Sequence, residues 1–483
     1  MILIGLRALL KSVARFRLPP ALEAEAKERD LEGEPPERPE PPGGDRSGSQ
    51  TAPVPSRGLS RWGALGFVVL GVSALQLCDY TLVGAWSALG LGFVLGVARW
   101  RAAAADTTPR PDKRTQIAAL RAAGRLDVVW FYALPLALPS LILLVRARTW
   151  QGFSFSLLCV LAPVSLVLAL GGRRLTAKIT LATLVSLGLL LWAAVPRSAP
   201  GKIESHLLGG PAPSSWTPAA LVPEEDQFQL GTFFLPPTDR FVDWEQSVRV
   251  RRVFGAVYDR AGRDPDLAGL PGIMSATYRD VVGAELPRHL YVYAPPSPTP
   301  RPVILFLHGS LGSFQGYLSA LKGLADQEGL AIVSVSFGSG LWSRAGGLAR
   351  IEEALAFVAS DPRLDSQGVI AVGISAGGVA ASRAGAAFPD RLRGLALLSP
   401  VIEPELFAET WRKRPVLVVH GALDRRIPQA YVDGAVAELK QAGVRVSYVL
   451  VPNEDHFLYF SETATVNAAL ATWIRGVLRS GGG

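Results

Sequence analysis

Long apolar runs dominate the first half of the chain. Five of them follow one another between Trp62 and Val195, separated by short polar or charged loops. Each approaches the roughly 20 residues that an α-helix needs to cross the hydrocarbon core of a bilayer. A single run would also fit a buried core helix, but five in succession predict a five-helix transmembrane region over residues 61–196. The runs are 62–78, 80–98, 126–145, 152–170 and 176–195.

The apolar pattern changes after residue 273. Short runs rich in Val, Ile and Leu now alternate with segments of helical character, such as 344–359 and 429–441. This alternation predicts an α/β domain over residues 274–480, with a doubly wound, mostly parallel sheet covered by helices on both faces. We expect eight strands, the first two forming an antiparallel hairpin at one edge: 274–282, 286–294, 303–307, 331–337, 369–373, 394–398, 416–419 and 446–451.

The N-terminal segment 1–60 has neither pattern. Residues 1–18 mix apolar and basic side chains, which fits a short helix lying on a membrane surface. A misassigned start of the chain explains this stretch equally well. Residues 19–60 are rich in Pro, Glu, Gly and Ser and contain few large apolar residues, so we expect a disordered tail.

Residues 197–273 form a mixed segment between the two apolar regions. The stretch 200–223 is rich in Pro, Gly and Ser and is typical of a linker. Farther on, Val242–Tyr258 combines apolar and basic residues in a pattern that predicts an amphipathic helix packed on the following domain. We therefore interpret 197–273 as a linker and accessory segment, with no function assigned to it.

The net charge of +8 and the sequence pI of about 9.6 do not indicate a nucleic-acid binder. Such a protein would gather its basic residues in a patch with aromatic neighbours, whereas here many lie in loops beside the apolar runs. Lys and Arg collect on the cytoplasmic side of membrane proteins, so the N-terminus is expected inside and the domain after residue 195 outside the cytoplasm. The basic loops expected inside contain Arg57, Arg61, Arg99, Arg101, Arg110, Lys113, Arg114, Arg121, Arg125, Arg173, Arg174 and Lys178.

Two prolines in the third apolar run leave this topology open. Pro135 and Pro139 leave open a kinked or incomplete crossing, and an incomplete crossing would place the α/β domain on the other side.

The apolar runs carry few ionisable groups, and Asp79 and Asp127 stand at their ends. Since charges inside a membrane usually mark a path for ions or substrates, a transporter is disfavoured.

One strand-to-helix junction in the α/β domain carries a candidate nucleophile. The apolar run that begins at Val369 leads into Gly373-Ile374-Ser375-Ala376-Gly377 and then into an alanine-rich stretch that favours helix. A tight turn from strand to helix needs small neighbours, which Gly373 and Gly377 provide, and it leaves Ser375 projecting above the sheet edge. This Gly-x-Ser-x-Gly pattern resembles the nucleophile elbow of the α/β-hydrolase superfamily. The resemblance implies that Ser375 is the nucleophile.

A second loop resembles part of the same superfamily's site. His308-Gly309-Ser310-Leu311-Gly312 follows the strand 303–307 and is similar to the His-Gly-x-x-Gly loop that forms half of an oxyanion hole. An attacked ester carbonyl becomes negatively charged, so two backbone N–H groups must already point at its oxygen. By resemblance these are the amides of Ser310 and Ala376, with Leu311 as the alternative to Ser310. We expect His308 itself to order the loop.

A third loop supplies a candidate acid. His420 to Pro428 follows the strand 416–419 and has the pattern His-Gly-x-x-Asp-x-x-x-Pro. It resembles the acid-residue loop of dienelactone-hydrolase-like and prolyl-oligopeptidase-like proteins. The resemblance implies that Asp424 orients the catalytic imidazole and stabilises it when protonated. A plain structural role for Asp424, capping the next helix, is the alternative.

The candidate base follows the last predicted strand. His456 stands in Asn453-Glu454-Asp455-His456-Phe457, so the three catalytic candidates come in the order Ser375, Asp424, His456, each just after a strand. Glu454 and Asp455 are alternative acids, but side chains adjacent in sequence to the base rarely reach it, and we set them aside. Ester hydrolysis by such a Ser-Asp-His triad requires no metal or organic cofactor. The two cysteines, both inside apolar runs, provide neither a disulfide framework nor a metal-ligand spacing.

Together these patterns predict a membrane-anchored serine hydrolase that cleaves carboxylic esters. Only Val401–Arg414 separates the strand 394–398 from the next, which leaves no room for a large cap domain over the site. An open site near a membrane would suit lipid-like esters. We also keep Trp342 and Phe314 as candidates for the acyl pocket, with core packing the expected role. The alternatives are a peptidase or acyltransferase with the same triad, and a non-catalytic membrane receptor or scaffold. The oligomeric state stays open.

Overall fold

The computed structural model describes residues 141–157, 185, 188, 201–210, 222–233, 235–267, 270 and 273–480. The segment 1–60 and most of the five predicted spans lie outside the described residues. Within the part of the chain that is described, no helix has both the length and the apolar character needed to cross a bilayer.

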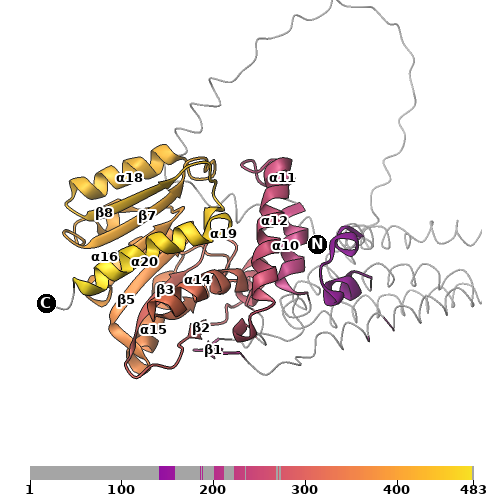
Figure 1. The fold of residues 1–483 in the computed structure, drawn as a ribbon, viewed down its shortest axis with the longest axis horizontal. Coiled ribbons are helices and arrows are strands. Elements are labelled where there is room, and N and C mark those ends of the chain that lie inside the picture. Colours follow the sequence, from indigo (N-terminus) through magenta and orange to yellow (C-terminus); the bar gives the residue numbers. More distant parts are fainter. Residues whose placement is uncertain are drawn as a thin grey trace, which may run out of the picture.

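An eight-stranded sheet forms the centre of the described chain (Figure 1). Its strands lie in the order β1-β2-β4-β3-β5-β6-β7-β8. The pairs β1–β2 and β2–β4 are antiparallel, and all other pairs are parallel. The predicted α/β class with a mostly parallel, eight-stranded sheet is therefore confirmed. The strands are β1 Ile203–Leu207, β2 His289–Tyr293, β3 Arg301–Leu307, β4 Ala331–Val335, β5 Leu364–Ile374, β6 Gly394–Leu398, β7 Pro415–Gly421 and β8 Arg445–Val451.

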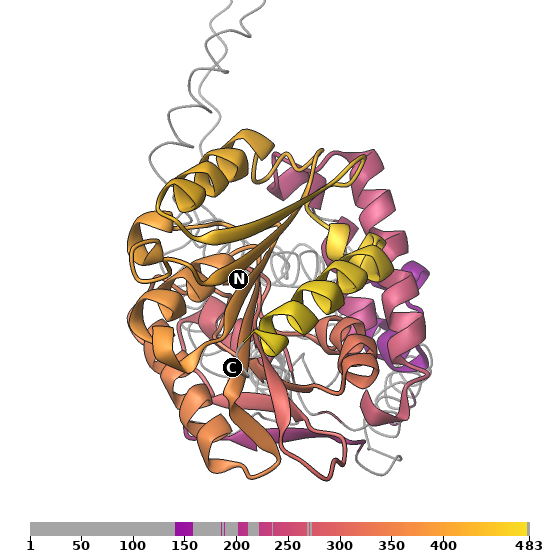
Figure 2. The ribbon, with the colours of Figure 1, turned by 60° about the vertical axis from the view of Figure 1, so that its left-hand side comes forward.

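Helices cover both faces of this twisted sheet (Figure 2). α14, α20 and α12 lie on one face, whereas α15, α16 and α18 lie on the other. The α-helices are α10 Glu224–Phe233, α11 Leu235–Thr238, α12 Trp244–Ala261, α13 Ser275–Val282, α14 Gln315–Glu328, α15 Gly347–Ser360, α16 Gly377–Ala387, α17 Pro404–Phe407, α18 Gln429–Gln441, α19 Leu458–Ser461 and α20 Thr463–Arg479.

The alternation of side chains along β3 explains why both faces are buried. Ile304 and Phe306 pack into the core beneath α12, α14 and α20, whereas Val303, Leu305 and Leu307 pack beneath α15 and α16. Successive side chains of a strand point to opposite faces, so a continuous apolar run belongs in a sheet covered on both sides. The apolar runs of the sequence therefore mark the central strands well.

One predicted strand is wrong. Residues 274–282, expected as the first strand of an edge hairpin, form the helix α13. The helix ends at Gly283, which adopts a left-handed conformation with φ 74° and donates its backbone N–H to the carbonyls of Arg279 and Asp280. Glycine at this position is a common helix terminator. The β-branched and aromatic residues of 274–282 favoured a strand, and the terminating glycine was the signal against it.

The missing edge strand is β1, which comes from the segment interpreted as a linker. Its residues pair antiparallel with β2, with Ser205 opposite Tyr291. Along β1 only Ile203 is fully buried, and Glu204 pairs with Arg363 at the surface. A five-residue strand between Pro- and Gly-rich stretches carries little periodic signal. The sheet thus keeps eight strands but takes its edge from an earlier part of the chain.

The predicted amphipathic helix of the accessory segment is confirmed as α12. Asp243 caps its N-terminus by accepting a hydrogen bond of 2.8 Å from the amide of Gln246. Val250, Phe254 and Val257 are buried on one side of the helix, where α12 contacts α10, α14 and α19. This helix therefore belongs to the packed core beside the sheet.

Candidate active site

Ser375 lies on a sharp turn between β5 and α16. Its backbone has a left-handed φ of 53°, which is strained for a residue other than glycine. The turn is held by three hydrogen bonds: the Ser375 amide donates to the Leu398 carbonyl at 2.9 Å, and the Ser375 carbonyl accepts from the amides of Gly378 at 2.9 Å and Val401 at 3.1 Å. The surrounding strands over-determine the strained conformation, which leaves the serine partly exposed at the sheet edge.

The two glycines of the motif are required by space. A Cβ on Gly373 would lie 2.2 Å from the carbonyl oxygen of Gly377, and a Cβ on Gly377 would lie 2.0 Å from that of Leu307. Both distances are far below van der Waals contact. The Gly-x-Ser-x-Gly pattern therefore follows from the closeness of β3, β5 and α16 around the turn, as the sequence predicts.

The structure brings the three predicted catalytic residues together in one chain of hydrogen bonds. His456 Nε2 lies 3.0 Å from Ser375 Oγ, and His456 Nδ1 lies 2.7 Å from Asp424 Oδ2. Because Nδ1–H donates to the carboxylate, Nε2 is left as the acceptor for the serine hydroxyl. The arrangement can take a proton from Ser375 and hold the resulting imidazolium beside a negative charge.

Asp424 is a buried carboxylate with several donors. Its Oδ1 accepts hydrogen bonds from the amides of Arg426 and Ile427, both at 2.9 Å. Burial by itself raises the pKa of Asp424, but the adjacent His456 and the Ile427 amide outweigh it, and the pKa stays below its ordinary value. The side chain is therefore ionised and fixed. Asp424 does not cap the next helix, which was the alternative role, because α18 begins only at Gln429.

The His308 loop lies directly against Ser375. A methyl group on Gly309 would stand 3.3 Å from Cβ of Ser375, which shows how close the two loops are. His308 is fully buried; its Nε2 accepts a hydrogen bond of 3.0 Å from the Phe337 amide, and its carbonyl accepts one of 2.9 Å from the Trp342 indole. Burial lowers the pKa of His308 to about 4, so it is neutral. The prediction that His308 orders its loop is confirmed.

The candidate oxyanion donors stand at the tips of two turns. A hydrogen bond of 3.1 Å from the Gly312 amide to the Gly309 carbonyl closes the first turn and leaves Ser310 and Leu311 at its tip. Ala376 is the N-cap residue of α16, where the first backbone N–H groups of a helix have no intrahelical partner. Within the described residues, no hydrogen bond engages the amides of Ser310 or Ala376. Both amides therefore stay candidates for the oxyanion hole.

Other candidates take structural positions. Trp342 and Phe314 are 2% and 1% exposed and pack inside the core, which matches their expected role. In the part of the chain that the structure describes, no group of three or more His, Cys, Asp or Glu side chains is placed to hold a metal ion.

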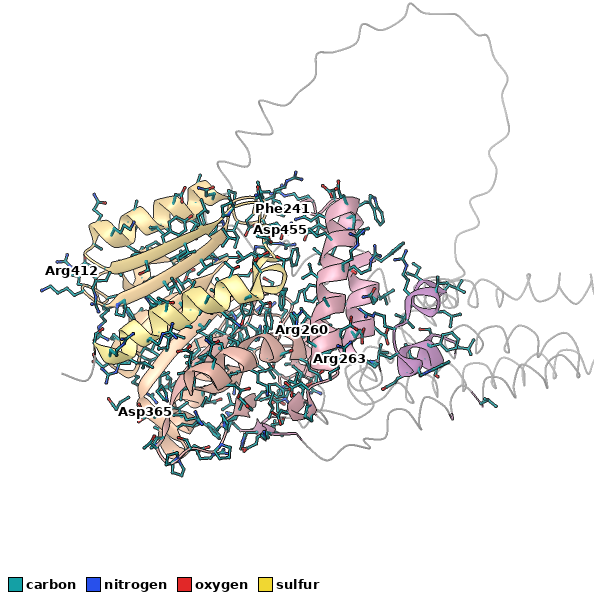
Figure 3. The ribbon with its side chains drawn as sticks, viewed as in Figure 1. Phe241, Arg260, Arg263, Asp365, Arg412 and Asp455 are labelled. Carbon is teal, nitrogen blue, oxygen red and sulfur yellow. The ribbon has the colours of Figure 1, made fainter. Side chains whose placement is uncertain are left out.

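The main feature that the sequence did not reveal is the contact of α12 with the loop that bears His456. Arg249 lies against Glu454 and Asp455, the two residues just before His456. Nearby, Arg426 of the Asp424 loop pairs with Asp239, which follows α11. Figure 3 shows Asp455 on the side of the sheet domain that faces α12, whereas Asp365 and Arg412 lie at the opposite end. Amphipathicity located the helix, but no local signal pointed to its partners.

Comparisons with known proteins give similarity to solved structures alone. No protein-family model and no curated protein matches the chain. Similar structures include an esterase from the archaeon Pyrobaculum calidifontis, 19% identical over 40% of this chain and 82% of that chain, with a TM-score of 0.35. Esterase PE8 is 19% identical over 38% of this chain and 97% of its own, with a TM-score of 0.34. Est1E from Butyrivibrio proteoclasticus is 18% identical over 40% of this chain and 95% of its own, also with a TM-score of 0.34. Because these identities and scores are low, we base the function on the geometry of the site.

Proposed function

We propose that this protein is a serine hydrolase that cleaves carboxylic esters, with Ser375 as nucleophile, His456 as base and Asp424 as the orienting acid. One observation carries the proposal. A serine in a strained, left-handed turn lies 3.0 Å from an imidazole nitrogen, whose other nitrogen lies 2.7 Å from a buried carboxylate. A plain structural role does not require all three residues in this order and geometry.

The proposed reaction proceeds through an acyl-enzyme. Ser375 Oγ attacks the ester carbonyl carbon while its proton moves to His456 Nε2. The carbonyl oxygen becomes an oxyanion, which the amides of Ala376 and Ser310 stabilise; losing one such donor typically costs about 3 kcal/mol. The carbon–oxygen bond to the alcohol then breaks, and His456 returns the proton to the departing alcohol. Water repeats the sequence on the acyl-enzyme, which releases the carboxylic acid and restores Ser375.

Lipid-like esters are the substrate class that we propose. The connection from β6 to β7 contains only the short helix α17, so no large cap is inserted at that point. Leu311 and Leu423, in the loops that carry the oxyanion donors and Asp424, are 48% and 56% exposed. Exposed apolar side chains in the loops of the proposed site suit an apolar acyl chain.

The predicted spans lead us to propose that the domain is held at a membrane, outside the cytoplasm. The backbone amide of Arg148 donates to Asp226 Oδ1 at 2.7 Å, and Thr149 also contacts Asp226. In the proposed topology, the loop between the third and fourth predicted spans and the α/β domain lie on the same side of the membrane. The contact with Asp226 supports this proposal, because the two predicted spans between them would return the chain to that side. The distribution of arginines supports the choice of side.

Labelling with a fluorophosphonate probe tests the catalytic proposal. The probe phosphonylates an activated serine, so wild type should label and the Ser375→Ala variant should not. Folded wild type that does not label would favour the receptor reading. Short-chain esters, long-chain esters, thioesters and peptides then form the substrate panel, and activity confined to peptides or to acyl transfer would contradict ester hydrolysis.

A reporter enzyme that is active only outside the cytoplasm tests the location. Fused after Gly483, it should be active in intact cells. A well-expressed but inactive fusion would place the domain inside, as expected if the third predicted span does not cross.

A further inference from the structure

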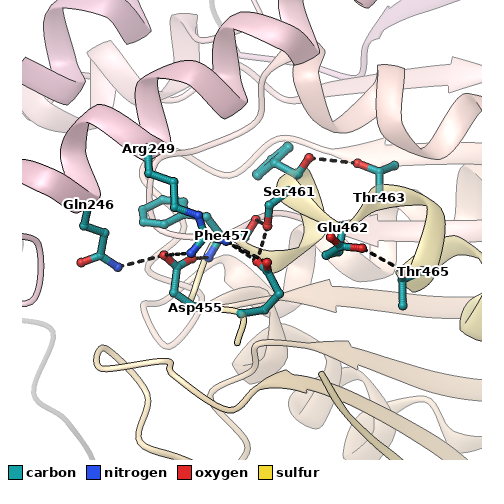
Figure 4. Close-up of polar contacts among 10 residues, drawn as sticks. Gln246, Arg249, Asp455, Phe457, Ser461, Glu462, Thr463 and Thr465 are labelled. Carbon is teal, nitrogen blue, oxygen red and sulfur yellow. Dashed lines mark hydrogen bonds and ion pairs between the residues drawn. The ribbon is translucent and has the colours of Figure 1, made fainter. Parts of the chain in front are cut away.

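The loop that bears His456 is held from outside by α12 (Figure 4). Arg249 donates from Nη2 to both carboxylate oxygens of Glu454, at 2.8 and 2.7 Å, and its Nη1 lies 3.3 Å from Asp455 Oδ2. Gln246, one turn earlier on the same helix, donates to Asp455 Oδ2 at 3.0 Å. Two side chains of one helix therefore hold the two residues that precede the base.

The same loop is fixed on its other side by the Asp424 loop. The Leu423 amide donates to the Glu454 carbonyl at 2.8 Å, and a Cβ on Gly421 would lie 2.4 Å from that oxygen. Asn453 begins the loop with a left-handed φ of 60°. The backbone turns sharply at this residue and passes close to β7, so this side of the loop is fixed by the sheet, and the other side is open to a second contact. Arg249 and Gln246 supply that contact.

Charge and burial make Arg249 the main contact that stabilises the position of this loop. The side chains of Glu454 and Asp455 are 12% and 7% exposed, so two neighbouring carboxylates are largely shielded from water. Without a cation they would repel each other, and the loop would relieve the repulsion by moving outward. The planar guanidinium can bind Glu454 with two hydrogen bonds and still face Asp455, which an ammonium cannot do as well.

The helix that presents Arg249 is itself well anchored. Val250 and Phe254 of α12 are 1% and 2% exposed, and the Phe254 ring stacks on Phe228 at 4.4 Å. At the far end of α12, Asp259 pairs with Arg148 at 2.7 Å. Because α12 is packed in this way, Arg249 has a fixed position and can restrain the loop. A helix that moved freely on the surface could not do so.

We propose that Arg249 is a positioning residue, which holds the loop through Glu454 and Asp455 so that His456 Nε2 stays within hydrogen-bonding distance of Ser375. This inference rests on the proposed hydrolase function. It gives the accessory segment an indirect part in catalysis, because Arg249 acts through the loop and touches neither the substrate nor the reacting atoms.

Steady-state kinetics of the full-length protein with p-nitrophenyl butyrate test this role. Arg249→Met keeps most of the side-chain stem and removes the charge. We expect kcat to fall about 10-fold to 100-fold, because small displacements of a catalytic group have effects of this size, while KM changes less than about two-fold. Arg249→Lys should recover part of kcat, since it restores the charge without the paired hydrogen bonds.

Two further variants separate positioning from general destabilisation. Glu454→Gln keeps the shape of the loop and weakens the same contact, so it should lower kcat by a smaller factor. Combined with Arg249→Met, it should add little, because both changes break one interaction. Arg252→Met is the matched control: Arg252 is exposed on the same helix, and no ion pair of it is found within the described residues. This control should keep the wild-type kcat.

The outcomes separate this inference from the proposed function. An active wild type with an equally active Arg249→Met variant would overturn the positioning role alone. So would a rise in KM at unchanged kcat, or full additivity of the two changes. If Arg249→Met does not fold, as judged by circular dichroism, an unchanged kcat in folded Glu454→Gln overturns the role. Folded wild type that neither labels with fluorophosphonate nor cleaves the ester would instead overturn the proposed function, and the inference with it.

Discussion

Glu224 is a buried acid that the proposed mechanism does not use. Its Oε2 accepts hydrogen bonds from the Tyr258 hydroxyl at 2.9 Å and the Gln315 amide at 2.7 Å, whereas Oε1 has no partner among the described residues. Burial raises the pKa of Glu224 from 4.5 to about 7, although the two hydrogen bonds act against the change. The folded protein thus holds a proton here that the unfolded chain releases at lower pH.

This difference predicts a pH-dependent contribution to stability that Glu224→Gln should remove. The contribution of Glu224 to the free energy of unfolding should fall as pH rises from about 4.5 to about 7, by about 1.4 kcal/mol for each unit of pKa difference. Other buried groups titrate in the same range, so the quantity to compare is the difference between the variant and wild type. Glutamine cannot ionise and still accepts both hydrogen bonds. The variant should therefore match wild type at pH 4.5 and exceed its stability at pH 8. Chemical denaturation at the two pH values measures this.

Glu352→Gln is the matched control, because it makes the same change at an exposed glutamate of α15. A Glu224→Gln variant with the same stability difference from wild type at both pH values would contradict a raised pKa at Glu224.

At the scale of elements, the turn from β5 to α16 depends on close contact of three segments. Gly377 faces the end of β3, and no side chain fits between them. Gly434 provides the opposite case, because it lies exposed within α18 and a Cβ there would meet nothing within 4 Å. The two glycines separate the cost of space from the intrinsic preference of a helix for alanine.

Gly377→Ala should therefore lower the free energy of unfolding by about 1–3 kcal/mol, as overpacking of a tight site does. It should also reduce fluorophosphonate labelling, since the strain falls on the turn that carries Ser375. Gly434→Ala should instead stabilise the protein by up to about 1 kcal/mol and leave labelling unchanged. Thermal unfolding and labelling rates of both variants measure the contrast, and equal effects of the two changes would count against it.

At the scale of the whole molecule, residues before 274 complete the sheet domain. β1 covers the edge of β2, whose five residues are all buried, and α12 covers the aromatic cluster around Phe314. A domain that began at residue 274 would expose both surfaces. The boundary read from the sequence thus falls inside the packed unit.

Fragments with different starts test this. A fragment of residues 274–480 should be insoluble or bind the dye ANS strongly, because it exposes a long unpaired strand edge and the core beneath α12. A fragment of residues 201–480 keeps β1 and α12 and should show a cooperative unfolding transition. A soluble, cooperatively folded 274–480 fragment would show that the accessory segment is dispensable for folding.

The sequence by itself determined the α/β class and the three residues at the centre of the site. Ser375, Asp424 and His456 were readable because each follows an apolar strand in a short motif of its own. The carboxyl ends of parallel strands meet at one edge of a sheet, so order along the chain was enough to predict that these residues meet in space. The steric need for Gly373 is local in the same way, because its close neighbour is Gly377, whereas Gly377 is required by the approach of Leu307 from β3.

Only the tertiary structure decided the edge of the sheet and the support of the base. β1 is too short for a periodic signal and becomes a strand through its pairing with β2, while 274–282 has strand-forming residues yet is terminated as a helix at Gly283. Arg249 and Glu454 stand 205 residues apart. An ion pair at such a separation leaves no local pattern, because its energy depends on burial and distance in the folded chain.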